Sequence, residues 1–170
     1  MKIYNMLAII ALAATTMFAG NPPGGSNEET NFDKLKSLVG SWKGKDSEGK
    51  PVTITYKLVS GGTSIMETLD MADDKEAMIT MYHMNGDKLM MTHYCSLGNQ
   101  PRMQAAKTSK DGSTIAFSFV DITNLASKED NYMRKLMFTF KDNDHFSQQW
   151  TLRMKGNHEH PDVFEFERMK

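Results

Sequence analysis

Hydrophobic and polar positions alternate with a period of two along most of the chain after residue 41. Successive side chains of a β-strand point to opposite faces of a sheet, so this alternation is typical of half-buried strands. About ten such segments, each of ordinary strand length, are bounded by turn residues. The expected strands cover 52–58, 65–69, 77–84, 88–95, 102–108, 115–119, 132–140 and 145–154, with one before them near Trp42 and a last one that contains Phe164 and Phe166.

Short turns join these segments. Asn85-Gly86 is the strongest hairpin signal, and Gly61-Gly62, Asp111-Gly112 and the polar run 141–144 mark further turns. No stretch shows the alternation of strands and helices that a parallel sheet requires. Sequential antiparallel strands hide their edges best by closing on themselves. The sequence therefore predicts an all-β, antiparallel up-and-down barrel of about ten strands, with a two-sheet sandwich as the alternative.

A short helix is expected before the first strand. Phe32, Leu35 and Leu38 follow a near-helical spacing, Asn31 is a candidate N-cap, and Gly40 is placed to end the helix. An amphipathic helix of this length is suited to closing one end of a barrel.

The Asn85-Gly86 turn also predicts a register. A two-residue loop places Met84 opposite Asp87, Tyr82 opposite Leu89 and Met78 opposite His93. One face of this hairpin then carries apolar bulk and a few polar groups, as a ligand-binding interior does. We expect this face to point inward; its members are Met78, Thr80, Tyr82, Leu89, Met91, His93 and Cys95.

Residues 1–19 differ from the rest of the chain. Lys2 is followed by the apolar run 6–19, which ends in small residues. This pattern predicts a secretory signal peptide cut after Ala19, with a buried N-terminal helix as the alternative. Residues 20–30 are rich in Pro, Gly and polar side chains and are expected to form a flexible linker, so the barrel domain is expected to cover 31–170. The protein is then exported, either to the periplasm or out of the cell.

The charge of the chain bears on which classes of partner it can bind. The formal net charge is −1 with a pI near 6.5, and lysine and arginine are scattered. Neither a basic nucleic-acid footprint nor a polybasic membrane patch is present. No segment after the signal is long and apolar enough to span a membrane. The single cysteine, Cys95, cannot form an intrachain disulfide. The oligomeric state is left open.

Two stretches resemble known families. The segment 38–44 (LVGSWKG) resembles the opening of the calycins, in which a Gly-x-Trp element starts the first strand; lipocalins, fatty-acid-binding proteins and nitrobindins share that architecture. The longer nitrobindin element is matched up to Gly44, where Asp46 replaces its last glycine. The segments 89–95 and 98–103 resemble an exported bacterial family with a domain of unknown function that is calycin-like, and the resemblance spans most of 32–168. It implies a calycin-like barrel and, more distantly, haem held by a late histidine.

The main functional hypothesis is an exported barrel that binds a small, largely apolar or amphipathic molecule inside. Tryptophans and methionines would give contact area, while His93, Gln100 and Arg102 would orient a polar end, with Arg102 suited to a carboxylate or phosphate. Tyr94 is retained in case the other face of its strand points inward. The candidate ligand-binding residues are Trp42, Tyr82, Met91, His93, Tyr94, Cys95, Gln100, Arg102 and Trp150.

Three alternatives remain. Cys95 and His93 share a strand face and could serve a hydrolase or redox enzyme, although no catalytic motif is recognised. His158 and His160 are an apparent metal pair, but Gly156-Asn157 and Pro161 predict a loop there and no third ligand is indicated. Fifteen methionines suggest a soft metal such as Cu(I), yet they are dispersed. No metal ligands are therefore assigned, and the cofactor is unknown.

Overall fold

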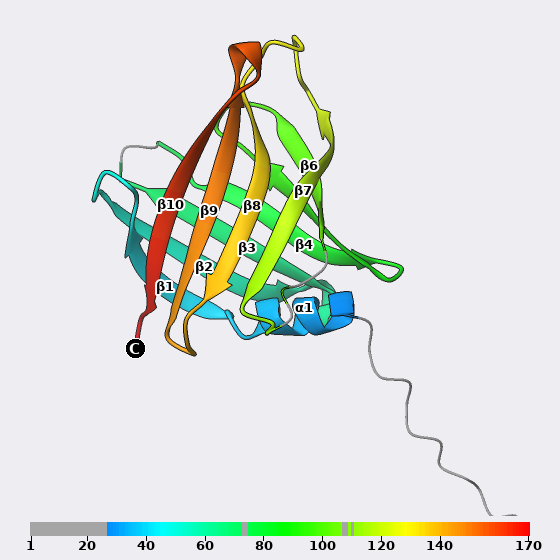
Figure 1. The fold of residues 1–170 in the computed structure, drawn as a ribbon. Coiled ribbons are helices and arrows are strands. Elements are labelled where there is room, and N and C mark those ends of the chain that lie inside the picture. The colour runs from blue at the N-terminus through cyan, green and yellow to red at the C-terminus, as the bar shows by residue number, and fades with distance from the viewer. Residues whose placement is uncertain (1–26, 73–74, 107–108, 110) are drawn as a thin grey trace, which may run out of the picture.

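The alternating segments form ten antiparallel strands that close into one barrel, with a single short helix at one end (Figure 1). This computed structural model describes residues 27–72, 75–106, 109 and 111–170, so the proposed signal peptide lies outside the described residues. The predicted fold class is confirmed, and the sandwich alternative is wrong. The elements are α1 Asn27–Lys36, β1 Gly40–Lys45, β2 Pro51–Val59, β3 Ser64–Met71, β4 Met78–Asn85, β5 Lys88–Tyr94, β6 Gln100–Ala105, β7 Thr114–Thr123, β8 Tyr132–Phe140, β9 His145–Met154 and β10 His158–Arg168.

Each strand pairs with its neighbours in sequence, and β1 closes the barrel against β10. This closing seam is short, because it joins only 42–45 to 165–168. β10 is longer than β1, and its first half, 158–164, pairs with β9 alone among the described strands. The wall is therefore incomplete at the end where β9 and β10 turn, far from α1 (Figure 1).

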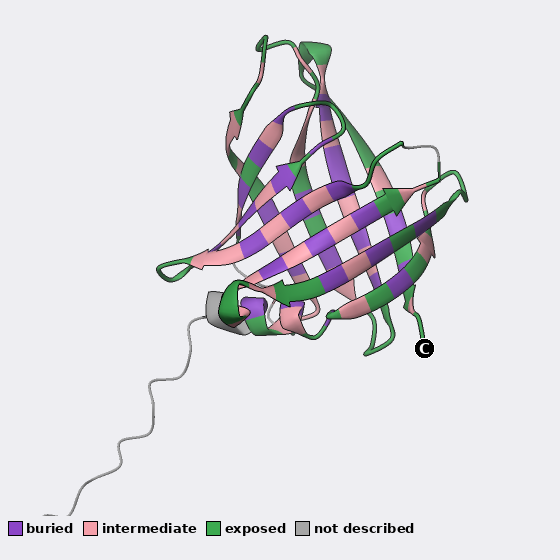
Figure 2. Ribbon diagram, turned by 180° about the vertical axis from the view of Figure 1, so that it is seen from behind, coloured by how far each residue is buried: buried purple, intermediate pink, exposed green. Residues whose placement is uncertain are grey.

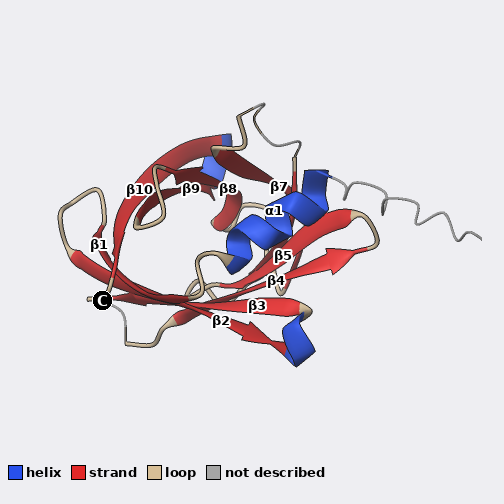
Figure 3. Ribbon diagram, turned by 90° about the horizontal axis from the view of Figure 1, so that it is seen from below, coloured by secondary structure: helices blue, strands red, loops and turns tan. Residues whose placement is uncertain are grey.

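The helix lies across the opposite barrel end (Figure 3). It buries Phe32 and Leu35 against the barrel interior, which is why an amphipathic segment is placed there. The helix begins at Asn27, a full turn before the expected cap. Asn31 is buried inside the helix and is not its N-cap, so that expectation was wrong.

Trp42 forms the floor of the closed end. Its indole Nε1 donates to the Leu38 carbonyl at 2.8 Å, directly after the helix. The Arg168 guanidinium lies 4.1 Å from the Trp42 ring centroid, and Phe146 meets the indole edge-on at 4.7 Å. Arg168 also donates to the carbonyls of Ser37 and Val39. Helix, first strand and last strand are thus tied together at one point, so this end of the barrel is closed.

The hairpin register differs from the expected one. Asn85 pairs with Lys88, Tyr82 with Met91 and Thr80 with His93, which is a shift of two residues from the prediction. The loop is Gly86-Asp87, and Gly86 takes a φ of 62°, which glycine adopts without strain. Because the side-chain period is two, a shift of two keeps every residue on its face. The whole predicted inward face is accordingly buried, which confirms that His93 points inside. Buried positions alternate with intermediate or exposed ones along the strands (Figure 2).

Candidate functional site

A cavity of about 240 Å³ opens at the barrel end opposite α1. It is surrounded by the end of β3, the start of β4, the β5–β6 connection and the parts of β8, β9 and β10 that lie far from α1. Its wall is mainly apolar, and its polar groups are few. The lining residues are Leu69, Met71, Met78, His93, Cys95, Ser96, Leu97, Met133, Trp150, Leu152, Asp162 and Phe164.

A buried polar network lies beneath this cavity and is centred on Glu67 of β3. The Tyr82 hydroxyl donates to Glu67 Oε2 at 2.7 Å, and Gln148 Nε2 donates to the same oxygen at 2.9 Å. The Thr80 hydroxyl donates to Oε1 at 3.3 Å. Each of these side chains is buried. The interior at this level is therefore filled by hydrogen-bonded side chains, and the space for a ligand lies above it.

The amide of Gln148 has one possible orientation. Trp150 Nε1, which can only donate, donates to Gln148 Oε1 at 3.0 Å. The amide nitrogen must then face the other way, and it donates to Tyr56 Oη at 2.7 Å as well as to Glu67. Tyr56 is in turn left with its own hydrogen to donate. The groups around Glu67 are thus all donors, which is the environment of a carboxylate.

Two effects act on the Glu67 carboxyl. Burial raises its pKa, because the charged form loses its hydration, and hydrogen bonds from Tyr82, Tyr56, Gln148 and Thr80 oppose that rise. Burial also raises the pKa of Tyr56 and Tyr82 well above the ordinary value, and the Glu67 charge adds to the effect. Both phenols therefore remain neutral donors at physiological pH.

His93 connects the network to the cavity. Its Nδ1 lies 2.9 Å from Thr80 Oγ1, and its ring centroid lies 4.6 Å from that of Trp150. Burial lowers the pKa of His93 to about 4, so the imidazole is neutral at pH 7. Among the described residues, the hydrogen bond of the His93 ring is made through Nδ1, and Nε2 makes none. A neutral imidazole with one nitrogen anchored and the other available is a binding group for a ligand in the cavity.

The predicted ligand-binding residues do not all meet here. His93, Cys95 and Trp150 line the cavity, Tyr82 and Met91 lie deeper in the filled interior, and Trp42 lies at the closed end. The remaining three lie on or near the outer wall. Tyr94 is 49% exposed. Arg102 forms an exposed bidentate pair with Asp121, and Gln100 accepts from the Thr123 hydroxyl at 2.8 Å.

The late histidines do not fit a haem or metal ligand. His158 and His160 begin strand β10 instead of forming the expected loop, and both are exposed, as is His145. None of the three lines the cavity. Within the described ranges, no group of three or more His, Cys, Asp or Glu side chains is placed to hold a metal ion.

Sequence reasoning missed the acidic centre of the network. Glu67 lies between Ile65 and Leu69, at the inward positions of the strand expected over 65–69. A charged side chain at an inward position is the available signal, because a carboxylate is rarely buried without partners. Gln148, between Phe146 and Trp150, carries the same signal. Tyr56, in the strand expected over 52–58, is not distinguishable from an ordinary apolar core residue.

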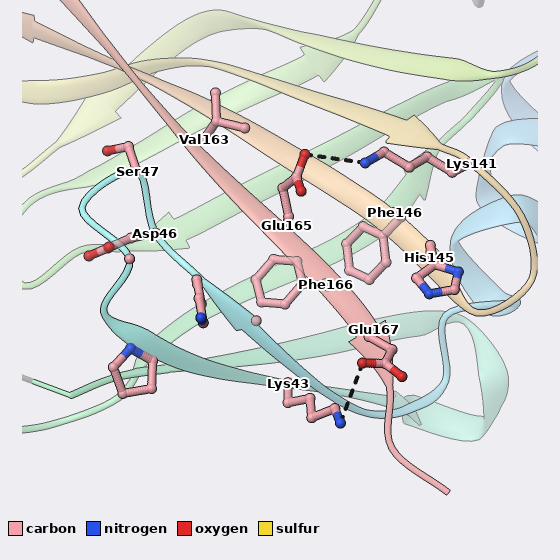
Figure 4. A pocket seen from close by; sticks show the side chains of 14 residues that line it. Lys43, Asp46, Ser47, Lys141, His145, Phe146, Val163, Glu165, Phe166 and Glu167 are labelled. Atoms are coloured by element: carbon pink, nitrogen blue, oxygen red, sulfur yellow. Dashed lines mark hydrogen bonds and ion pairs between the residues drawn. The ribbon is translucent and has the colours of Figure 1, made fainter.

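A larger hollow of about 880 Å³ lies at the β1–β10 seam (Figure 4). Four of its charged side chains form ion pairs: Lys43 pairs with Glu167 at 3.3 Å, and Lys141 with Glu165 at 3.2 Å. These pairs are largely exposed, and exposed pairs are readily replaced by water. The hollow offers no buried polar group comparable to His93, so the barrel mouth is the stronger candidate site.

Cys95 allows a direct test of the thiol-enzyme alternative. A reactive thiol needs a cationic neighbour that lowers its pKa, and the described lining of the cavity holds no lysine or arginine while His93 is neutral. We expect iodoacetamide at pH 7.5 to modify Cys95 at least about a hundredfold more slowly in the folded protein than in urea. Mass spectrometry gives both rates without ambiguity, because the chain has one cysteine. Alkylation at the unfolded rate or faster would instead favour an enzyme that uses Cys95 with His93.

Comparison with known proteins supports the fold. No known protein family profile matches the chain, and no curated protein does. Among solved structures, Rv2717c from M. tuberculosis is similar, with a TM-score of 0.54 and 14% identity over 82% of this chain and 97% of that one. A protein of unknown function from the DUF3598 family of Nostoc punctiforme is similar with a TM-score of 0.53 and 11% identity. The match covers 79% of this chain and 49% of that one, so this chain spans about half its length.

Fold and cavity together define the class: a closed ten-strand antiparallel barrel with one sealed end and a small, mainly apolar cavity at the other. At these identities the similarity establishes the fold alone. The described part of the chain contains no helix long and apolar enough to cross a membrane.

Proposed function

We propose that this protein is an exported barrel that binds a small, largely apolar molecule in the cavity at the barrel mouth. One observation carries the proposal. An apolar wall surrounds a single buried imidazole whose Nε2 is available, and convergent polar groups in an apolar cavity are the usual form of a small-molecule site. The network beneath holds that imidazole in place.

The size of the cavity limits the ligand. Ligand pockets usually measure about 300–1,000 Å³, whereas an engineered apolar cavity of about 150 Å³ holds benzene. At about 240 Å³, the cavity suits a molecule with one ring or a short branched chain. A long acyl chain would have to extend beyond the mouth. The ligand is therefore smaller than the fatty acids that the resemblance to fatty-acid-binding proteins suggests.

Three features of the sequence support export, a calycin-like relation and a small-molecule partner. The pattern of residues 1–19 supports export, and the Gly-Ser-Trp element at 40–42 supports a calycin-like relation. Scattered charges support a small-molecule partner in place of nucleic acid. Whether the exported protein is periplasmic or secreted follows from none of these features.

Blocking the cavity tests the proposal. Leu152 lies at the half-buried rim on β9, so Leu152→Trp should place an indole in the mouth. We expect the affinity for phenol, measured by isothermal titration calorimetry, to fall at least about tenfold, because the added ring occupies the space of the ligand. Met137→Trp, on the outer face of β8, is the matched control and should leave binding unchanged. Equal affinity in both variants would place binding elsewhere.

A second candidate, a Cu(I) site, is favoured by one further observation. The thioethers of Met71, Met78 and Met133 line the same cavity as His93 and Cys95, so ligands dispersed in sequence converge in space. Thioether, thiol and imidazole groups suit Cu(I). Competition with the chelator bicinchoninate tests this candidate: retention of one Cu(I) per chain, lost in Met78→Leu, would support it. Complete transfer of copper to the chelator would remove it.

A further inference from the structure

The hydrogen-bond network specifies which atom of His93 carries its proton. The Thr80 hydroxyl lies between two groups, Glu67 Oε1 at 3.3 Å and His93 Nδ1 at 2.9 Å, and it has one hydrogen to donate. Glu67 receives hydrogen bonds from all its other neighbours, which fits a carboxylate that can only accept. Thr80 therefore donates to Glu67. Its oxygen is then the acceptor for a hydrogen on His93 Nδ1.

The opposite nitrogen follows from this assignment. A neutral imidazole carries one hydrogen, so a protonated Nδ1 leaves Nε2 with a lone pair. His93 is 2% exposed and lines the cavity, and Nε2 has no partner among the described residues. The cavity thus contains a buried hydrogen-bond acceptor, His93 Nε2. The contact between Nδ1 and the Thr80 hydroxyl beneath the ring fixes its orientation.

The charges around the cavity point to the same type of ligand. No lysine or arginine lines its described wall, and Arg102, which the sequence suggested for an anionic head group, is outside and paired with Asp121. The ionisable group that shares the cavity with His93 and Cys95 is Asp162, a carboxylate that accepts from the Ser47 hydroxyl. Glu67 lies below. An anion placed here would face carboxylates, and the described wall offers no lysine or arginine to pair with it, which strongly disfavours its binding.

We propose that the ligand is a neutral, largely apolar molecule whose polar group is a hydroxyl or N–H that donates to His93 Nε2, as in a phenol, an alcohol or an indole. This assignment rests on the proposed function and adds the chemical class of its ligand. It excludes carboxylates and phosphates, the head groups that Arg102 would have served.

Three one-ring probes of similar size test the class by calorimetry on the intact folded protein at pH 7.5. Phenol can donate, anisole has the same ring and oxygen but no donor, and benzoate is an anion. We expect phenol to bind at least about tenfold more tightly than anisole, because only phenol satisfies the buried acceptor, and benzoate to bind more weakly than either.

Thr80→Val tests the positioning role of Thr80. Valine preserves the shape of the side chain but removes the acceptor for the hydrogen on His93 Nδ1. The affinity for phenol divided by the affinity for anisole should therefore fall toward one. Thr92→Val, at an outward position of β5, is the matched control and should keep the ratio. Nitrogen-15 NMR of labelled histidine distinguishes the two neutral forms of His93, which a purely structural effect of Thr80 would leave unchanged. We expect the Nδ1–H form in the unaltered protein and its loss in Thr80→Val.

The outcomes separate the two proposals. Equal binding of phenol and anisole, tighter binding of benzoate, or an Nε2–H form of His93 would overturn the ligand class while leaving an apolar binding site. Failure of all three probes to bind would overturn the proposed function itself and the assignment that rests on it.

Discussion

Replacing Glu67 with alanine should lower the free energy of unfolding by about 3 kcal/mol. The loss of an acceptor for several buried donors and the new cavity destabilise the fold, and the removal of a buried charge offsets part of that cost. Tyr82 Oη and Gln148 Nε2 both donate to Glu67 Oε2, and all three residues are buried. Removing the carboxylate leaves these donors without their acceptor in a space that water does not readily reach. Urea unfolding at pH 7 followed by circular dichroism measures the loss.

Two controls separate the network from simple loss of volume. Glu165→Ala removes the same side chain from the outer face of β10, where it forms an exposed ion pair, and should change stability little. Tyr82→Phe alone should cost about 1–2 kcal/mol, but close to nothing once Glu67 is already alanine. Additive losses in the double variant would show that the two side chains are not coupled, which would contradict a carboxylate held by the phenol.

The barrel was predictable because its signal is repeated in every strand. A period of two over the segments from residue 52 to 154, with Asn85-Gly86 as a tight turn, leaves few folds for a single domain. The hairpin register was less certain, since the sequence does not distinguish Asn85-Gly86 from Gly86-Asp87 as the loop. The error was harmless for the site, because a shift of two residues preserves the face that each side chain occupies.

The site was predictable only in part. His93 and Cys95 could be assigned to the interior from the pattern of β5, and Trp150 from that of β9. Arg102 could not be placed, because strand β6 begins earlier than expected, at Gln100. The Arg102 side chain then points outward between the buried Pro101 and Met103.

The contacts of Glu67 could not be predicted either, because they join strands that are distant along the chain. Glu67 on β3 meets Gln148 on β9 across the barrel interior, and no local pattern relates the two positions. Closure of the barrel sets this distance, so the pair emerges only when the ten strands are assembled.

The titration of His93 should lower the free energy of unfolding by about 2–3 kcal/mol when the pH falls from 7.5 to 4.5. Its pKa is lowered to about 4 in the folded barrel by burial, whereas an unfolded chain protonates histidine near its ordinary value of 6.5. Below pH 6.5 the unfolded state takes up the proton first, so stability falls as the pH falls. The loss levels off below about pH 4, where the folded state is protonated as well.

His93→Asn isolates this contribution, because asparagine retains a side-chain hydrogen-bonding group but does not titrate. The difference in unfolding free energy between the two proteins should shrink by about 2–3 kcal/mol from pH 7.5 to pH 4.5. Glu67 acts on stability in the opposite direction. Its pKa is raised by burial, so a lower pH favours protonation of the buried carboxyl and stabilises the fold. Glu67 and Asp162 are present in both proteins, so to first order their effects cancel in the difference. A difference that stays constant with pH would mean that the imidazole is hydrated and the mouth open to bulk water, and the ligand would then have no buried acceptor to satisfy.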